Sequence, residues 1–95
     1  MKKGIFEDYV KKVLALFCIS KEDLFAKSKR RDLVDARHLL YYLCYHRPMQ
    51  IRYIQNYMAE NGYKVGHSSI IHGINQVSEK ANEDKDYETV CQSLT

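Results

Sequence analysis

The segment from Leu33 to Tyr45 constrains the fold most, because it is apolar on almost every side of the helix that its spacing predicts. Apolar residues recur at helical intervals through it, at positions 33, 36, 39, 40, 43 and 44. Three tyrosines, Tyr41, Tyr42 and Tyr45, fill much of the remaining surface. A helix with so little polar surface must be surrounded by other elements, so we predict that it is the central helix of the domain, with Asp32 as its N-cap.

Amphipathic stripes with the same period predict further helices over residues 5–18, 49–60 and 67–78, with a last helix around residues 87–94. Ser20 and Asp23 form a capping box that opens one more short turn of helix. Pro48 closes the connection before helix 49–60, and Asn61-Gly62 ends that helix, since both residues tolerate a left-handed backbone. No segment has the pattern of a strand. We therefore predict an all-α domain of five to six helices.

The length and composition fit one domain that spans residues 1–95. A chain of 95 residues with 45% hydrophobic content can bury one core without disulfides or metals. Its net charge of +3 is too small to indicate nucleic acid by itself. The distribution is uneven, because residues 1–53 carry a net charge of +6 and residues 54–95 a net charge of −3. The chain therefore has a basic half and an acidic tail.

The cysteines and the N-terminus predict a cytoplasmic protein. Cys18, Cys44 and Cys91 are odd in number, widely spaced and each set in an apolar helical context. We expect them to be reduced thiols in or near the core. The first residues lead into amphipathic sequence rather than a long apolar run, so we expect neither a signal peptide nor a membrane span.

Residues 66–78 carry a pattern that favours nucleic-acid binding. Ile70, Ile71, Ile74 and Val77 give this predicted helix one buried face. Its first turn has only small or polar side chains. A polar helix start, entered through a glycine-containing turn after another amphipathic helix, is what a helix-turn-helix presents to the major groove of DNA. An ordinary capped helix in a small bundle is the alternative interpretation.

The polar side chains of this helix are candidate contacts to DNA: His67, Ser68, Ser69 and His72. Ser68 or Ser69 is also the expected N-cap, because a serine hydroxyl accepts a hydrogen bond from a free backbone N–H. Gly66 permits the turn just before it. Small polar side chains at a helix start are able to reach base edges and thymine methyl groups.

A cationic loop precedes the central helix. Four cations and one serine lie close together in it: Lys27, Ser28, Lys29, Arg30 and Arg31. Cations at this density neutralise phosphates and release counterions, which gives affinity without sequence information. The loop and the helix 67–78 together favour double-stranded DNA as the partner. Taken alone, the loop is better explained as a solvated surface segment.

No arrangement of residues predicts catalysis or a cofactor. His67 and His72 are five apart, which does not bring both onto one helical face as a metal-binding spacing of four would. No nucleophile elbow, phosphate-binding glycine loop or paired carboxylate motif frames the serines, cysteines and histidines. We expect a protein that is not an enzyme and that binds no metal, nucleotide or other cofactor. Most of the eight tyrosines fall at helix-packing positions, which favours a structural use over stacking on single-stranded bases.

The order of these features resembles the C-terminal DNA-binding domain of the bacterial replication initiator DnaA, and the similarity covers nearly the whole chain. In that family an amphipathic helix is followed by an aspartate-leucine pair with a basic loop, as in residues 23–31, and by an arginine that opens a long apolar helix, as Arg37 does. The family pattern of histidine, two Ser or Thr, two aliphatics, histidine and a small residue matches residues 67–73. The resemblance implies a helical domain with a Trp-repressor-like helix-turn-helix.

The resemblance also implies roles for individual residues. Arg31 would enter the minor groove, while His67, Ser68 and Ser69 would lie at the edge of the major groove. The remaining cations of the loop would lie near phosphates: Lys27, Lys29 and Arg30.

The sequence departs from the family pattern at positions that contact DNA bases in that family. Val65 and Gly66 stand where the family has arginine and then aspartate, so the guanidinium that would bind guanine bidentately is missing. The segment between residues 54 and 67 is longer than in the family, and Gln55 replaces a glycine. Lys64, in this longer turn, is the candidate replacement for the lost arginine.

We therefore expect a stand-alone domain of this kind, from a phage or mobile element, that binds double-stranded DNA in the bacterial cytoplasm. It would act by occupancy, in replication control or transcription regulation. The alternative is a protein-interaction or virion-associated structural module that keeps the fold, with a protein partner or self-association in place of DNA. Binding of structured RNA is a third hypothesis.

Overall fold

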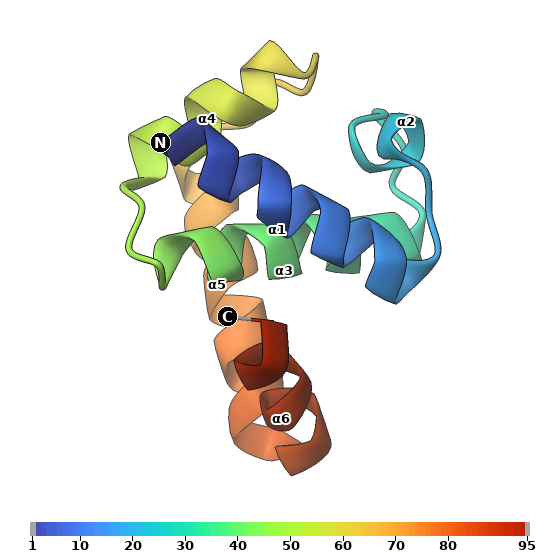
Figure 1. The fold of residues 1–95 in the computed structure, drawn as a ribbon, viewed down its shortest axis with the longest axis vertical. Helices are drawn as coiled ribbons and strands as arrows, with labels where there is room; N and C mark the ends of the chain where they lie inside the picture. The colour runs from blue at the N-terminus through green and yellow to red at the C-terminus, as the bar shows by residue number, and fades with distance from the viewer. Residues whose placement is uncertain (1, 95) are drawn as a thin grey trace.

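The computed structural model describes residues 2–94 of the chain. These residues form six helices joined by turns and loops, and they contain no strand. In chain order they are α1 (Lys2–Phe17), α2 (Lys21–Leu24), α3 (Arg31–Tyr45), α4 (Ile51–Glu60), α5 (His67–Glu83) and α6 (Lys85–Leu94) (Figure 1). The prediction of an all-α chain with five to six helices is confirmed. Within the described residues, none of these helices has the length and apolar character that crossing a membrane requires.

The helix α3 is at the centre of the packing, as its apolar sequence predicts. It packs against α1, α2, α4 and α5, and Figure 1 shows α1 crossing in front of it. Its buried residues are Leu33, Ala36, Arg37, Leu39, Leu40, Tyr41, Leu43 and Cys44. Seven of these eight are apolar or aromatic, so the buried Arg37 is the exception that needs an explanation.

Two predicted helix ends are confirmed. Ser20 caps α2, because the backbone N–H of Asp23 donates to its hydroxyl over 3.1 Å. The chain leaves α4 through Gly62, whose φ of +86° lies in the left-handed region that glycine adopts without strain. Asn61 keeps a φ of −95°, and its amide donates to the backbone carbonyl of Tyr57.

The prediction that Asp32 caps α3 is wrong. The helix begins at Arg31, two residues earlier than predicted, and its N-cap is Arg30. The Asp32 carboxylate lies in the first turn, where it accepts a hydrogen bond from the N–H of Leu33 and pairs with the guanidinium of Arg30. The carboxylate therefore neutralises part of the loop's charge next to the positive end of the helix dipole.

The prediction that Ser68 or Ser69 caps α5 is also wrong. The helix begins at His67, and its N-cap is Gly66, with an extended backbone at φ −87° and ψ 164°. Since glycine has no side chain, no side-chain group caps the free N–H groups of this first turn. Both serines lie inside the helix, where they are exposed.

The helix α5 is longer than predicted, because it runs on to Glu83 rather than ending at residue 78. Its buried residues are Ile70, Gly73, Ile74, Val77 and Ala81. Ile71, which we expected on this buried face, is 44% exposed. At 3.6 residues per turn, Ile71 lies roughly 100° around the helix from the centre of this buried set, at the edge of the packed face.

Two of the three cysteines are buried free thiols, as predicted. Burial raises the pKa of the Cys44 thiol to about 12, so this group stays protonated at neutral pH and packs as a small apolar side chain. Cys91 is also buried. Cys18 is exposed instead, because it follows the end of α1 in a left-handed backbone with a φ of +54° that turns the chain toward α2.

Gly73 allows α5 to approach α3. A Cβ at this position would lie 2.8 Å from Cδ2 of His38 and 2.9 Å from Cδ2 of Tyr41. We predict that Gly73→Ala lowers the free energy of unfolding by about 1–2 kcal/mol, because overpacking outweighs the gain in helix propensity. Gly4→Ala in α1 is the matched control, since an added Cβ meets nothing within 4 Å there. Urea unfolding measures both variants, and a stabilised Gly73→Ala variant would contradict this packing.

Candidate nucleic-acid interface

The cationic residues 27–31, which we call the basic loop, and the start of α5 lie on one face of the molecule, over the N-terminal half of α3. Three adjoining hollows mark this face, and Val34 of α3 lines all three. Segments that are far apart in the sequence therefore meet around one residue. We call this surface the basic face.

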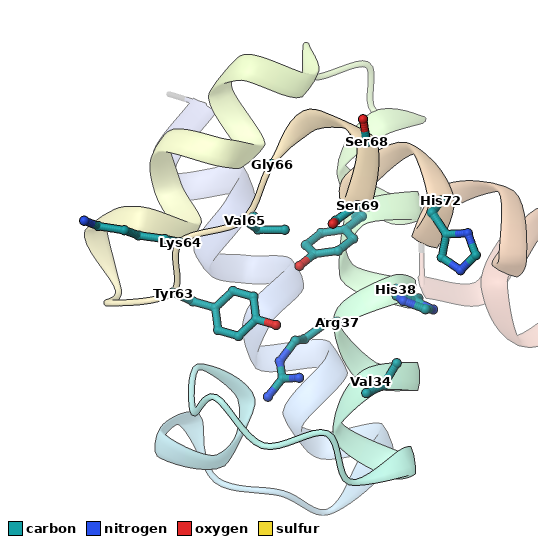
Figure 2. A pocket seen from close by; sticks show the side chains of 11 residues that line it. Val34, Arg37, His38, Tyr63, Lys64, Val65, Gly66, Ser68, Ser69 and His72 are labelled. Carbon is teal, nitrogen blue, oxygen red and sulfur yellow. The ribbon is translucent and has the colours of Figure 1, made fainter.

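The first hollow, which we call the serine hollow, has a volume of about 470 Å³. It lies between α3, the turn after α4 and the start of α5 (Figure 2). Among its lining residues are four of the candidates from the sequence: Lys64, Ser68, Ser69 and His72. Figure 2 shows the Lys64 side chain pointing outward from the turn, away from the hollow.

Two smaller hollows extend the basic face toward the loop. The histidine hollow, of about 300 Å³, is lined by Lys29, Arg31, Val34, Asp35, His38, His72, Gln76 and Lys80. The loop hollow, of about 190 Å³, is lined by Lys27, Ser28, Lys29, Val34, Arg37, Tyr63 and Lys64. The cations of the loop and the polar start of α5 thus form one continuous surface, as their predicted joint role requires.

Two candidates, Arg30 and His67, line none of these hollows. The guanidinium of Arg30 instead makes two hydrogen bonds to the carboxylate of Asp32, from Nε to Oδ1 over 2.8 Å and from Nη2 to Oδ2 over 3.1 Å. This hydrogen bonding lowers the pKa of Asp32. Arg30 is therefore the loop cation whose charge is most directly balanced, while His67 is exposed at the first position of α5.

Arg37, which the sequence did not predict as a site residue, holds the basic loop in place. Its side chain is only 3% exposed. Nε donates to the carbonyl of Leu24 over 2.7 Å, and Nη1 donates to the carbonyl of Ser28 over 2.9 Å. Nη2 donates to the carbonyl of Ala26. One guanidinium therefore binds the backbone on both sides of the loop's first cation, and Figure 2 shows it pointing from α3 toward the loop.

Arg37 also connects the loop to the turn before α5. Its guanidinium lies over the ring of Tyr63, 4.6 Å from the ring centroid. Figure 2 shows the two side chains next to each other. Farther along the turn, the side-chain amide of Gln55 in α4 donates to the carbonyl of Val65 over 2.9 Å. These contacts fix a turn that contains two glycines. An arginine within an otherwise apolar helix was the signal in the sequence that pointed to such a role.

An ion pair links the start of α3 to α5 in the histidine hollow. Oδ1 of Asp35 lies 3.5 Å from Nε of Arg31 and 3.4 Å from Nζ of Lys80. The Arg31 side chain is nevertheless 85% exposed, so its charge is available to a ligand. Lys80 belongs to the acidic half of the sequence and was missed there, because only the fold brings it beside the basic loop.

His38 and His72 meet between α3 and α5. Their ring centroids lie 5.8 Å apart with the planes nearly perpendicular. Burial holds the pKa of His38 below its ordinary value, and the neighbouring His72 lowers it further. Among the described residues no third metal-ligating side chain joins them, so they do not form a group of three or more potential metal ligands.

The lowered pKa of His38 makes stability depend on pH. Since the unfolded chain takes up a proton at this histidine at a higher pH than the folded chain, the free energy of unfolding falls as the pH drops below about 6.5. We predict a decrease between about pH 7 and about pH 5, with a flatter profile in His38→Gln. His38→Asn, which also removes the titrating imidazole, should flatten the profile in the same way. Identical profiles for all three proteins would contradict the assignment.

Comparison of the chain with known protein families, with curated proteins and with solved structures found no match. The all-α fold class and the basic face are therefore described from the structure alone, and we assign the chain to no family.

Proposed function

We propose that this chain binds double-stranded DNA through a helix-turn-helix formed by α4 and α5, in the manner of the C-terminal domain of DnaA. The observation that carries the proposal is the meeting of the basic loop and the polar start of α5 around Val34. A DNA duplex on this face would contact the cations with its phosphates and the start of α5 with its major groove at the same time. The protein would act by occupancy, in replication control or transcription regulation.

In the proposed complex α5 lies in the major groove and the basic loop follows the adjacent backbone. Arg31, which is 85% exposed, would reach the neighbouring minor groove. The remaining exposed cations of the basic face, Lys27, Lys29 and Lys64, would contact phosphates. The first turn of α5 lacks a side-chain cap, so its free N–H groups could also bind a phosphate.

A protein-interaction module is the second candidate, and exposed apolar side chains favour it. Leu16, Tyr45 and Ile71 are each between 44% and 45% exposed. Such a module would bind a protein partner or a second copy of the chain through an interface that salt weakens little, whereas DNA binding through phosphates weakens steeply with salt.

Affinity for a labelled duplex, measured by fluorescence anisotropy over a range of salt concentrations, tests the proposal. Binding should weaken steeply as salt rises, and Arg31→Ala should weaken it by about five- to tenfold and lower the salt slope by about one. Arg47→Ala is the matched control, because Arg47 is exposed but lines none of the three hollows. Ser68→Ala should weaken binding without changing the salt slope.

The same titration separates the other hypotheses. No affinity for the duplex at low salt, with a stable oligomer or a bound protein partner, would favour the interaction module. Preference for duplex RNA over duplex DNA in a competition measurement would favour the RNA hypothesis.

A further inference from the structure

Four residues of α5 form a stripe that faces away from the core. Ser68, Ile71, His72 and Asn75 follow the spacing i, i+3, i+4 and i+7, which places them on one side of the helix. All four are exposed, while the buried residues of α5 occupy the opposite side. We call these four residues the α5 stripe.

The α5 stripe does little for the fold. Ile71 is 44% exposed, so much of its apolar surface remains in water. The side chains of Ser68 and Asn75 make no hydrogen bond or ion pair with the rest of the described chain. Elsewhere, comparable groups stabilise the structure, as Ser20 does at the start of α2 and Asn61 at the end of α4. The side chains of Ser68, Ile71 and Asn75 are therefore free to contact a ligand, whereas the ring of His72 packs against that of His38.

The chemistry of the α5 stripe matches one kind of base pair. An asparagine amide binds adenine bidentately at N6 and N7, and an aliphatic side chain contacts the methyl group of thymine. The stripe contains neither arginine nor lysine, which are the residues that bind guanine at O6 and N7. An isoleucine beside an asparagine on one helix face therefore favours A·T over G·C pairs in the major groove.

The length of the α5 stripe limits the number of base pairs it reaches. From Ser68 to Asn75 the helix rises about 10 Å, which equals about three base pairs at 3.4 Å each. One turn beyond Asn75 the exposed residue on the same side is Glu79. Its carboxylate would be repelled by phosphates, so it marks the end of the surface that DNA contacts.

We infer that α5 selects A·T base pairs, with Asn75 binding adenine in the major groove and Ile71 contacting the methyl group of a thymine. This inference rests on the proposed function, because it names the bases that the proposed complex would read. Ser68 and His72 line the hollows of the basic face, whereas Ile71 and Asn75 line none of them. We therefore expect Ser68 and His72 to position the helix rather than choose the base pair. The base preference of α5 thus differs from that of a recognition helix in which an arginine binds guanine.

Base analogues test the two contacts separately on a duplex selected from a random pool. Uracil in place of thymine removes only the 5-methyl group, and 7-deazaadenine in place of adenine removes only the N7 acceptor. We expect each replacement, at the position concerned, to weaken binding by the parent protein about threefold or more. Ile71→Ala should no longer distinguish thymine from uracil, and Asn75→Ala should no longer distinguish adenine from 7-deazaadenine. Each variant should keep its sensitivity to the other analogue.

Matched controls show whether such an effect is local. Leu16→Ala removes an apolar side chain of similar exposure from α1, and Asn82→Ala removes an exposed amide from α5 beyond Glu79, outside the surface that DNA would contact. Both controls should bind and discriminate as the parent protein does. A selected motif of G·C pairs, or discrimination that survives in Ile71→Ala and Asn75→Ala, would overturn the inference. Salt-sensitive binding without any base preference would overturn it while leaving DNA binding intact, whereas absence of binding to any duplex would overturn both proposals.

Discussion

Neutralising four cations of the basic face, in the variant Lys27→Gln/Lys29→Gln/Arg31→Gln/Lys64→Gln, is expected to weaken duplex binding by about 10²- to 10³-fold at about 0.1 M salt. Each cation that neutralises phosphate charge releases a counterion, whether it contacts a phosphate or, as Arg31 would, enters the minor groove between the two backbones. The effects of the four cations on affinity therefore multiply. The slope of log affinity against log salt should fall by about 3 to 4, because each lost contact removes about 0.9. The fold should be unaffected, since all four side chains are exposed.

A second quadruple variant shows whether position matters or only total charge. Lys11→Gln/Lys21→Gln/Arg47→Gln/Arg52→Gln lowers the net charge from +3 by the same amount, but these exposed residues line none of the three hollows. We expect it to weaken binding by less than about threefold, because screening limits the effect of charges beyond a Debye length. Equal losses in the two variants would mean that DNA, if bound, is held by the net charge and not by the basic face.

Replacing Arg37 with leucine is expected to lower the free energy of unfolding by about 3–5 kcal/mol. The carbonyls of Leu24, Ala26 and Ser28 would lose their donor, and groups that folding removes from water without a partner are costly. The loss should be visible as a lower urea midpoint at an unchanged m-value. Arg52→Leu, at an exposed arginine of α4, should change stability by about 0.5 kcal/mol or less.

A conservative change at Arg37 separates its structural role from its charge. Arg37→Lys keeps the charge but cannot reproduce the planar guanidinium that binds several carbonyls at once. It should fold, with a stability between those of the parent protein and Arg37→Leu. Amide resonances of residues 24–30 should move in this variant, and a spectrum unchanged over that loop would contradict the role assigned to Arg37.

Much of the fold follows from local sequence. The periodicity of residues 33–45 gives a helix with almost no polar side, and such a helix has to be the one that others surround. Ser20 and Gly62 mark helix ends because a hydroxyl acceptor and a left-handed backbone are chemical requirements of those positions. The density of charge in the loop likewise excluded it from the core, and the fold places it at the surface.

The misplaced details depended on contacts that span the chain. Ile71 fits an apolar stripe in sequence, but the packing of α5 on α3 selects the side of the helix that contains Gly73. Lys80 lies in an acidic stretch and joins the basic face only because α5 runs past Asp35. The role of Arg37 required knowing that the loop folds back over its guanidinium. Periodicity gives no information about such partners.

The most direct test of the central claim maps the surface that contacts DNA, residue by residue. Amide chemical-shift changes in a ¹⁵N-labelled sample titrated with a DNA duplex should concentrate in the basic loop, residues 27–31, and in residues 64–75. The amides of α1 and α6, which contribute no residue to the three hollows, should move little. Changes centred on α1 or α6, or no changes at low salt, would contradict the assignment of the basic face as a DNA-binding surface.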